Sequence, residues 1–152
     1  MKKFELTSEF VTFLGKKLFR IKALVSFGDV KEGELGGLVE KEENLDQSGN
    51  AWVSGDAQVY GNARVYGNAQ VSGNAWVQNC RDYSATSCFG SENRTTTFFR
   101  TKDGGISVRC GCFYGTLREF REKVKERHGD SRLAKEYLML ADLMEFRLSK
   151  DE

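Results

Sequence analysis

The sequence contains no proline and a single histidine, His128. Without proline, its tight turns must be built from glycine, asparagine and aspartate, and 16 glycines are present. One histidine excludes a three-histidine zinc site and leaves little room for histidine-based catalysis. We expect His128 in the last turn of a helix, where a cation suits the helix dipole, and therefore predict a capping or surface role for it.

The chain also has a small net charge and no long hydrophobic run. The formal charge is +1 over 152 residues, which argues against a dedicated DNA-binding protein because such proteins need a basic excess. No apolar run approaches the roughly 20 residues that span a bilayer, and the first residues lead into no signal-like stretch. We therefore expect a cytoplasmic chain of one domain, or a small domain with an appendage, that binds neither DNA nor membrane.

Five consecutive hexads run from residue 49 to residue 78 and share the pattern Gly-(Asn/Asp)-Ala-x-Val-x. Alanine and valine are two positions apart, so in an extended segment they point to the same side. The Gly-Asn or Gly-Asp pair tolerates positive φ and predicts a corner. A short strand and a corner every six residues predict a β-helix, with three hexads in each 18-residue coil and valine inside. A disordered linker is disfavoured because linkers keep no such register.

The repeat continues upstream in a degraded form. Val39 and Leu45 are six residues apart, and Leu45 and Val53 are eight apart, which implies a two-residue insertion near Gln47 and Ser48. The first coil is predicted to be lined by Val39, Leu45 and Val53, the second by Val59, Val65 and Val71, and a third to begin with Val77 and Tyr83. Two to three coils make a short solenoid whose ends need caps.

The flanking segments have the patterns of such caps. Residues 4–27 alternate like a β-hairpin that turns at residues 15–17, and residues 95–100 and 106–110 flank a second turn that contains Asp-Gly. Thr116 and Glu119 form a capping box for a helix that ends at Gly129, and Asp130 or Ser131 begins a second helix.

The predicted fold is therefore mainly β with some α. It consists of a short parallel β-helix, an N-terminal β-hairpin cap, and a C-terminal β-hairpin followed by two helices. The predicted divisions are residues 1–30 for the first cap, 31–84 for the hexapeptide-repeat β-helix and 85–152 for the C-terminal region.

The segments around the hexads carry a resemblance. Residues 4–7, 18–24, 27–30 and 35–40 lead into Gly-Asn-Ala-x-Val-Tyr hexads, and residues 98–104 and 110–116 follow them. In this arrangement the chain resembles small phage and prophage proteins of the hexapeptide-repeat class. The resemblance implies a left-handed parallel β-helix, a symmetric homo-oligomer with a trimer favoured, and the cytoplasm of an infected bacterium. It implies no activity, because fold alone does not supply one.

Enzymes of the hexapeptide class need residues that are missing here. Their acyltransferases use a histidine base at a subunit interface, and their carbonic anhydrases bind zinc through three histidines. The sequence contains no P-loop, no dinucleotide fingerprint and no evident nucleophile–base pair. We therefore predict a protein that is not an enzyme and that needs no cofactor.

The four cysteines leave one alternative open. Cys80 and Cys88, and Cys110 and Cys112, have spacings that do not match the Cys-x2-Cys knuckle of structural zinc sites. Cys110 and Cys112 fall on one face of a strand, as core packing requires. Buried reduced thiols without metal are favoured, although a four-cysteine metal site, and with it an enzyme, stays possible.

The outward positions of the repeat are unusually aromatic. In coils of 18 residues, Gln70 stacks on Trp52 and Trp76 stacks on Gln58, and the faces carry four aromatic side chains with almost no charge. Such faces are typical of interfaces or stacking platforms. Three interpretations remain open: other parts of the same protomer cover the aromatics, a second copy covers them, or they bind a ligand.

The favoured functional hypothesis is a non-catalytic, phage-encoded oligomer that sequesters a small nucleotide-type immune signal at a protomer junction. Aromatic rings would stack on the base and cations would pair with phosphate. The predicted ligand-binding residues are Arg64, Arg100, Lys102, Arg109, Tyr60, Tyr66, Trp52 and Trp76. The alternative is a structural or protein-interaction module in which the solenoid is a rigid spacer.

Overall fold

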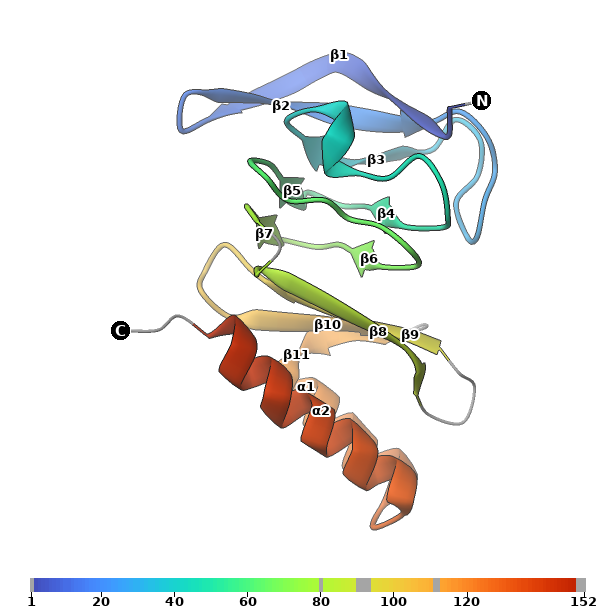
Figure 1. The fold of residues 1–152 in the computed structure, drawn as a ribbon, viewed down its shortest axis with the longest axis vertical. Helices are drawn as coiled ribbons and strands as arrows, with labels where there is room; N and C mark the ends of the chain where they lie inside the picture. Colours follow the sequence, from blue (N-terminus) through green and yellow to red (C-terminus); the bar gives the residue numbers. More distant parts are fainter. Residues whose placement is uncertain (1, 80, 90–93, 111–112, 150–152) are drawn as a thin grey trace.

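The computed structural model describes residues 2–79, 81–89, 94–110 and 113–149. Three parts follow one another along the long axis of the molecule: a β-hairpin, the stacked hexads, and an antiparallel sheet with two helices against its far side (Figure 1). The fold is thus mixed β with two helices. Neither helix combines the length and the apolar character that a membrane span requires, as judged over the described residues.

The N-terminal hairpin is present as predicted, but its turn lies earlier. Strands β1 (Phe4–Phe13) and β2 (Lys16–Ala23) pair in antiparallel fashion. Their two-residue connection is Leu14–Gly15, with φ values of 52° and 78°. Two consecutive positive φ values match the twist of a hairpin, so the turn needs only these two residues. The prediction of a turn at residues 15–17 was therefore wrong, and Lys16 and Lys17 belong to β2.

The hexads pair with one another in parallel at the predicted spacing. Val59 lies opposite Val77 and Val53 lies opposite Val71, which in both pairs is the residue 18 positions later. Gln70 also lies opposite Trp52, as the stacking argument predicted. The strands are short: β3 (Leu35–Val39), β4 (Trp52–Val53), β5 (Gln58–Val59), β6 (Gln70–Val71) and β7 (Trp76–Val77).

The two-residue insertion is also visible in the pairing. Val39 pairs with Val59, and Leu45 forms an isolated parallel bridge with Val65, so both pairs join residues 20 positions apart. Both pairs span the predicted insertion near Gln47, and a short 3-10 turn, η1 (Glu42–Asn44), lies between Val39 and Leu45. We call residues 35–79, with their three columns of parallel pairs, the hexad stack.

The strands of the hexad stack do not form one closed sheet. They are divided between a five-stranded sheet, in the order β1-β2-β3-β5-β7, and a two-stranded sheet of β4 and β6. Because β2 pairs with β3 in antiparallel fashion, the hairpin extends the sheet of the stack and covers its first strand. This pairing uses the backbone groups that the first strand of a parallel stack would otherwise leave open.

The repeated valines and alanines form the interior of the stack. The corner glycines at positions 49, 55, 61, 67 and 73 have φ between 64° and 74°, which turns the chain and keeps both side chains of each hexad on the inside. The prediction that the valines point inward is confirmed. The fully buried aliphatic residues are Val39, Val53, Val59, Val65, Val71, Val77, Ala51, Ala57, Ala69 and Ala75.

Two buried polar side chains complete the upper end of the stack. Asn44 is fully buried, and its amide nitrogen donates hydrogen bonds to the carbonyls of Gly61 and Ala63 at 3.3 and 2.8 Å. The ammonium of Lys3 donates to the carbonyl of Ala51 at 2.8 Å, and burial lowers the pKa of Lys3. Each group satisfies backbone carbonyls that would otherwise be buried without a partner.

A four-stranded antiparallel sheet closes the lower end of the stack. Its β9–β10 hairpin was predicted from the sequence. The strand before it and the strand after it were not predicted. The sheet order is β11-β10-β9-β8, formed by β8 (Tyr83–Phe89), β9 (Arg94–Arg100), β10 (Ile106–Cys110) and β11 (Phe113–Thr116).

The two predicted helices pack on the other side of this sheet as α1 (Leu117–His128) and α2 (Arg132–Leu148) (Figure 1). The capping box predicted at Thr116 is confirmed. The ring of His128 stacks on Tyr137 with 5.9 Å between ring centroids, so the histidine joins the two helices and is only partly exposed. A core separate from the stack lies between helices and sheet, formed by Phe98, Val108, Phe120, Val124, Tyr137, Leu140, Met144 and Leu148.

Glu40 connects the hairpin to the stack. Its lowered pKa should make the stability of the protein depend on pH. Its carboxylate accepts a hydrogen bond from the Gly61 amide at 2.9 Å and pairs with Lys16 at 3.3 Å. The Gly61 amide first, and Lys16 after it, hold the pKa of Glu40 below its ordinary value. A lowered pKa in the folded state stabilises the fold above the pKa of the unfolded state, and this contribution is lost as the pH falls through the folded-state value.

We therefore expect the free energy of unfolding to decrease when the pH is lowered from about 7 to about 3. The decrease should be larger in the wild-type protein than in Glu40→Gln, which has no carboxylate to protonate at this position. Urea denaturation of both proteins at the two pH values measures this difference. Equal losses in the two proteins would show that Glu40 contributes nothing to the acid sensitivity.

Candidate ligand-binding hollow

Trp52 follows one of the three open interpretations, since another part of the same protomer covers it. Its side chain is only 2% exposed and meets the ring of Phe27 edge-on, with 5.4 Å between centroids. The segment that follows the N-terminal hairpin thus covers this face within the same protomer. The indole nitrogen of Trp52 has no hydrogen-bond partner among the described residues. Trp52 therefore belongs to the core and offers no stacking surface to a ligand.

The hairpin also covers a second outer face. Tyr60 is 5% exposed and packs with Leu18 and Leu38. Phe13 reaches down from the end of β1 and contacts Tyr60 and Trp76, with ring centroids 5.6 and 4.8 Å away. Trp76 stays partly exposed at the edge of this cluster. Phe13 was not among the residues predicted for the site, because the alternation of β1 does not specify which distant residues its side chains contact.

A hollow of about 140 Å³ lies where this aromatic cluster meets the C-terminal sheet. It brings together four of the eight predicted ligand-binding residues, Tyr60, Trp76, Arg100 and Lys102. The rings come from the hexad stack and the cations come from the end of β9 and the turn after it. The other lining residues, which the sequence analysis did not predict, are Gln78, Asp82, Thr101 and Gly104.

Backbone contacts between the last hexad and the β9–β10 turn fix the geometry of the hollow. Ala75 and Thr101 form an antiparallel bridge, and the Lys102 amide donates a hydrogen bond to the Asn74 carbonyl at 3.0 Å. The turn itself is closed by Asp103, whose carboxylate accepts hydrogen bonds from the Thr101 hydroxyl and the Gly105 amide. These bonds, the Thr101 hydroxyl first, lower the pKa of Asp103. In Figure 1 this turn rises from the sheet toward β7.

The two cations of the hollow differ in whether an ion pair within the protein already neutralises their charge. The Arg100 guanidinium pairs with Asp82 at 3.4 Å and donates to the Leu148 carbonyl, so its charge is largely used within the protein. Asp82 also accepts a hydrogen bond from the Gln78 amide at 2.9 Å. The Lys102 side chain is exposed and forms no ion pair in the part of the chain that the structure describes. Lys102 therefore supplies the net positive charge.

Tyr60 contributes a neutral ring to the hollow. Burial first, and the nearby Asp82 carboxylate after it, raise the pKa of the Tyr60 hydroxyl. The hydroxyl therefore keeps its proton at neutral pH and adds no negative charge. The hollow thus combines two aromatic rings, a neutralised Arg100–Asp82 pair and the exposed ammonium of Lys102.

A larger hollow adjoins this one across the β9–β10 turn. It measures about 670 Å³ and shares Thr101 and Gly104 with the smaller hollow. Its far wall is the first turn of α1, with Arg118, and the ring of Tyr114. Three carboxylates, those of Asp103, Glu119 and Glu145, also line it, so it is a poor place for an anion.

The remaining predicted residues lie elsewhere. Arg64 lines a hollow of about 370 Å³ with Glu42, Glu43 and Asp46, and it pairs with Asp46 at 3.4 Å. Three carboxylates around one guanidinium make a poor place for an anion, so the expected phosphate-binding role of Arg64 does not fit its surroundings.

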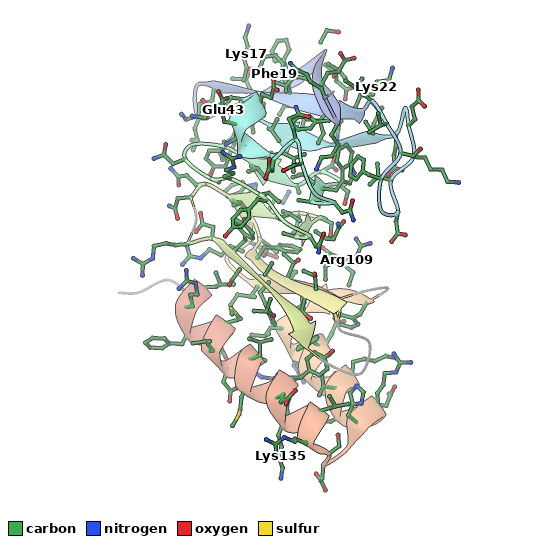
Figure 2. The ribbon with its side chains drawn as sticks, turned by 45° about the vertical axis from the view of Figure 1, so that its right-hand side comes forward. Lys17, Phe19, Lys22, Glu43, Arg109 and Lys135 are labelled. Atoms are coloured by element: carbon green, nitrogen blue, oxygen red, sulfur yellow. The ribbon has the colours of Figure 1, made fainter. Side chains whose placement is uncertain are left out.

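Tyr66 and Arg109 also lie outside the smaller hollow. Tyr66 is 60% exposed and lines a separate hollow of about 300 Å³ with Tyr83 and Arg147. Arg109, in the middle of β10, is partly buried, and Figure 2 shows it at the level where the hexad stack meets the C-terminal sheet. The eight predicted residues thus do not form a single site.

The prediction of buried reduced thiols can be compared with the structure at Cys110. Cys110 is a free, partly buried thiol whose sulfur accepts a hydrogen bond from the Thr96 hydroxyl at 3.2 Å. Cys80, Cys112 and the side chain of Cys88 lie outside the described residues. Within the described ranges, no three Asp, Glu, His or Cys side chains are grouped as a metal ion would require.

Comparison with known families gives one match, within the hexads. Residues 57–69 match the YdcK beta-solenoid repeat family. The match supports a beta-solenoid repeat. It covers little more than two hexads, whose Val59 and Val65 are the inward residues described above. No curated protein matches the chain.

Proposed function

We propose that the hexad stack is a short left-handed parallel β-helix of the hexapeptide-repeat type. Three columns of parallel pairs support this proposal, namely Val39–Val59–Val77, Leu45–Val65 and Val53–Val71. All their side chains are buried in one cluster, as expected for the three walls of a prism. The repeat-family match over residues 57–69 agrees with a solenoid.

We further propose that the chain is a non-catalytic binding protein for a small nucleotide-type ligand. The observation that carries this proposal is the hollow that the partly exposed ring of Trp76 lines together with the exposed Lys102. Aromatic rings can stack on a base, and an exposed ammonium can pair with a phosphate. Its volume of about 140 Å³ is below the roughly 300–1,000 Å³ of sites that enclose a whole ligand. It would therefore hold the base, and the phosphates would lie outside it, beside the exposed ammonium of Lys102.

The resemblance to phage proteins supports a more specific form of this proposal. In it, the ligand is a nucleotide immune signal of an infected bacterium, and the protein lowers its free concentration by binding without turnover. The position of His128 supports binding without catalysis, because this single histidine stacks on Tyr137 between the helices and lines none of the hollows described above.

Calorimetric titration with cyclic dinucleotides, cyclic ADP-ribose isomers and adenine mononucleotides tests the proposal. We expect one of these probes to bind, and Trp76→Ala to weaken its binding about tenfold or more because a stacking surface is lost. Lys102→Gln should weaken binding about fivefold and reduce its dependence on salt concentration. Since Lys102 is exposed, this second variant tests the site without disturbing the fold.

Lys17→Gln is the matched control, because Lys17 is also an exposed lysine but lies over Phe10 at the hairpin end of the molecule (Figure 2). It should bind the probe like the wild-type protein. The proposal fails if the whole panel gives no binding at high protein concentration, or if Lys17→Gln and Lys102→Gln weaken binding equally.

A structural or protein-interaction module is the second candidate. The burial of Trp52 and Tyr60 within one protomer favours it, because two of the four predicted stacking rings serve the stability of the stack. In that case, the probe panel would give no binding. The wild-type protein and Trp76→Ala would then retain the same protein partner in equal amounts during purification.

A further inference from the structure

Helix α2 has an apolar stripe on the face that points away from the sheet. Met139, Leu143 and Phe146 are 70%, 55% and 84% exposed. Their spacings of four and three residues place them on one side of the helix, while Tyr137, Leu140 and Met144 fill the core on the opposite side. Figure 2 shows Lys135, one turn before Met139, pointing away from the sheet. Three large apolar side chains grouped in this way are typical of an interaction surface.

Opposite charges lie on one flank of this stripe. Glu136 and Arg147 are eleven residues apart, about three helical turns, so both lie on the same side of the apolar residues. Neither side chain forms an ion pair with any residue in the described ranges. The other flank is already engaged, because Asp142 and Glu145 both pair with Arg121 of α1, at 2.7 and 2.8 Å. As far as the structure describes the chain, Glu136 and Arg147 are therefore an unpaired acid and an unpaired base on one flank, while two further unpaired bases, Arg132 and Lys135, precede the stripe.

We propose that the stripe binds a second copy of the chain, with the two α2 helices antiparallel about a two-fold axis. An axis near residues 141–142 places Met139 opposite Leu143 of the other copy. The same axis places Glu136 opposite Arg147, and the symmetry repeats this pair. Flanking charges of this kind set the partner and the orientation of paired helices. Glu136 and Arg147 thus complement each other across the axis, and this argues for a second copy as the partner.

Sedimentation equilibrium of the intact protein and its charge variants tests this inference. We expect a reversible dimer in the wild-type protein. Glu136→Arg and Arg147→Glu should each raise the dimer dissociation constant about tenfold or more, because two like-charge contacts replace two attractive ones. The double variant Glu136→Arg/Arg147→Glu should return the constant to within about threefold of the wild-type value.

Two further variants separate the interface from folding. Phe146→Glu should give a monomer with an unchanged circular dichroism spectrum, because its ring contributes to no described core. Leu14→Glu, at the exposed end of the hairpin, should leave the dimer intact. A wild-type protein that stays monomeric at all concentrations overturns the inference, and so does a double variant that fails to recover. Either result leaves the ligand hollow, which lies on other residues, untouched.

Discussion

Replacing Gly36 by alanine is expected to destabilise the protein by about 3 kcal/mol or more, as severe overpacking does. Gly36 lies in β3, where the hairpin sheet meets the stack. A Cβ atom there would lie 2.6 Å from both the Trp52 ring and the Val53 carbonyl oxygen, and 2.7 Å from the Ile21 side chain. One of these contacts is backbone and the other two are buried side chains, so none can move away cheaply.

Urea denaturation of Gly36→Ala and Gly105→Ala measures this effect against a matched control. Gly105 lies in the β9–β10 turn, and the nearest atom to a Cβ there is the Thr101 hydroxyl oxygen at 3.4 Å. Gly105→Ala should therefore change the free energy of unfolding by less than about 0.5 kcal/mol. If the two variants were equally stable, the close packing of Trp52 against β3 would be wrong.

Replacing Val65 by asparagine is expected to cost about 3–5 kcal/mol, from lost apolar burial and an amide without partners. Val65 is fully buried within the valine and alanine cluster of the stack. Its backbone is already paired, since its amide donates to the Asn44 carbonyl and its carbonyl accepts from the Asp46 amide. An asparagine side chain there would enter the apolar cluster of the stack. Such a loss is a large part of the roughly 5–15 kcal/mol that stabilises a domain.

Tyr66→Asn is the matched control because the same residue type is introduced at the next, outward position. Tyr66 is 60% exposed, so its replacement should cost less than about 1 kcal/mol. Thermal unfolding followed by circular dichroism compares the two variants. Similar melting temperatures would mean that position 65 does not face the interior.

The pairing of the hexads could be predicted from the sequence because the residues that determine the conformation of a hexad lie within that hexad. Each hexad contains one pair of inward residues and one corner, so the pairing register could be found by counting positions. The insertion near Gln47 could be found in the same way, and it increases the sequence separation of the Val39–Val59 pair to 20 residues. The capping box at Thr116 and the Asp-Gly turn were equally local signals. The extra strands β8 and β11 were missed, although turn-forming residue types precede β9 at 90–93 and follow β10 at Gly111.

The sequence left open what covers the outer faces, because the answer depends on contacts between distant segments. Phe27 covers Trp52, and Phe13 covers Tyr60 and part of Trp76. These contacts exist because β2 pairs with β3 and brings the hairpin down beside the stack. No periodicity in the repeat specifies which face the hairpin will cover.

The candidate site was predicted only in part, because its formation also depends on contacts between distant segments. Trp76 and Lys102 were chosen as an aromatic residue and a cation, and the bridge between Ala75 and Thr101 brings their segments together. Arg64 was chosen on the same grounds but lies among carboxylates contributed by a different part of the chain. Residue type alone could not separate these two outcomes.

Methyl NOE spectroscopy with amide hydrogen exchange tests the parallel stack on which both the site and its proposed function depend. We predict NOEs between the methyl groups of Val59 and Val77 and between those of Val53 and Val71. The amides of Gln58 and Tyr60, which donate to the carbonyls of Ala75 and Val77, should exchange slowly. NOEs that instead join valines of neighbouring hexads across antiparallel turns, together with rapid exchange at Gln58 and Tyr60, would contradict the stack and the hollow built on it.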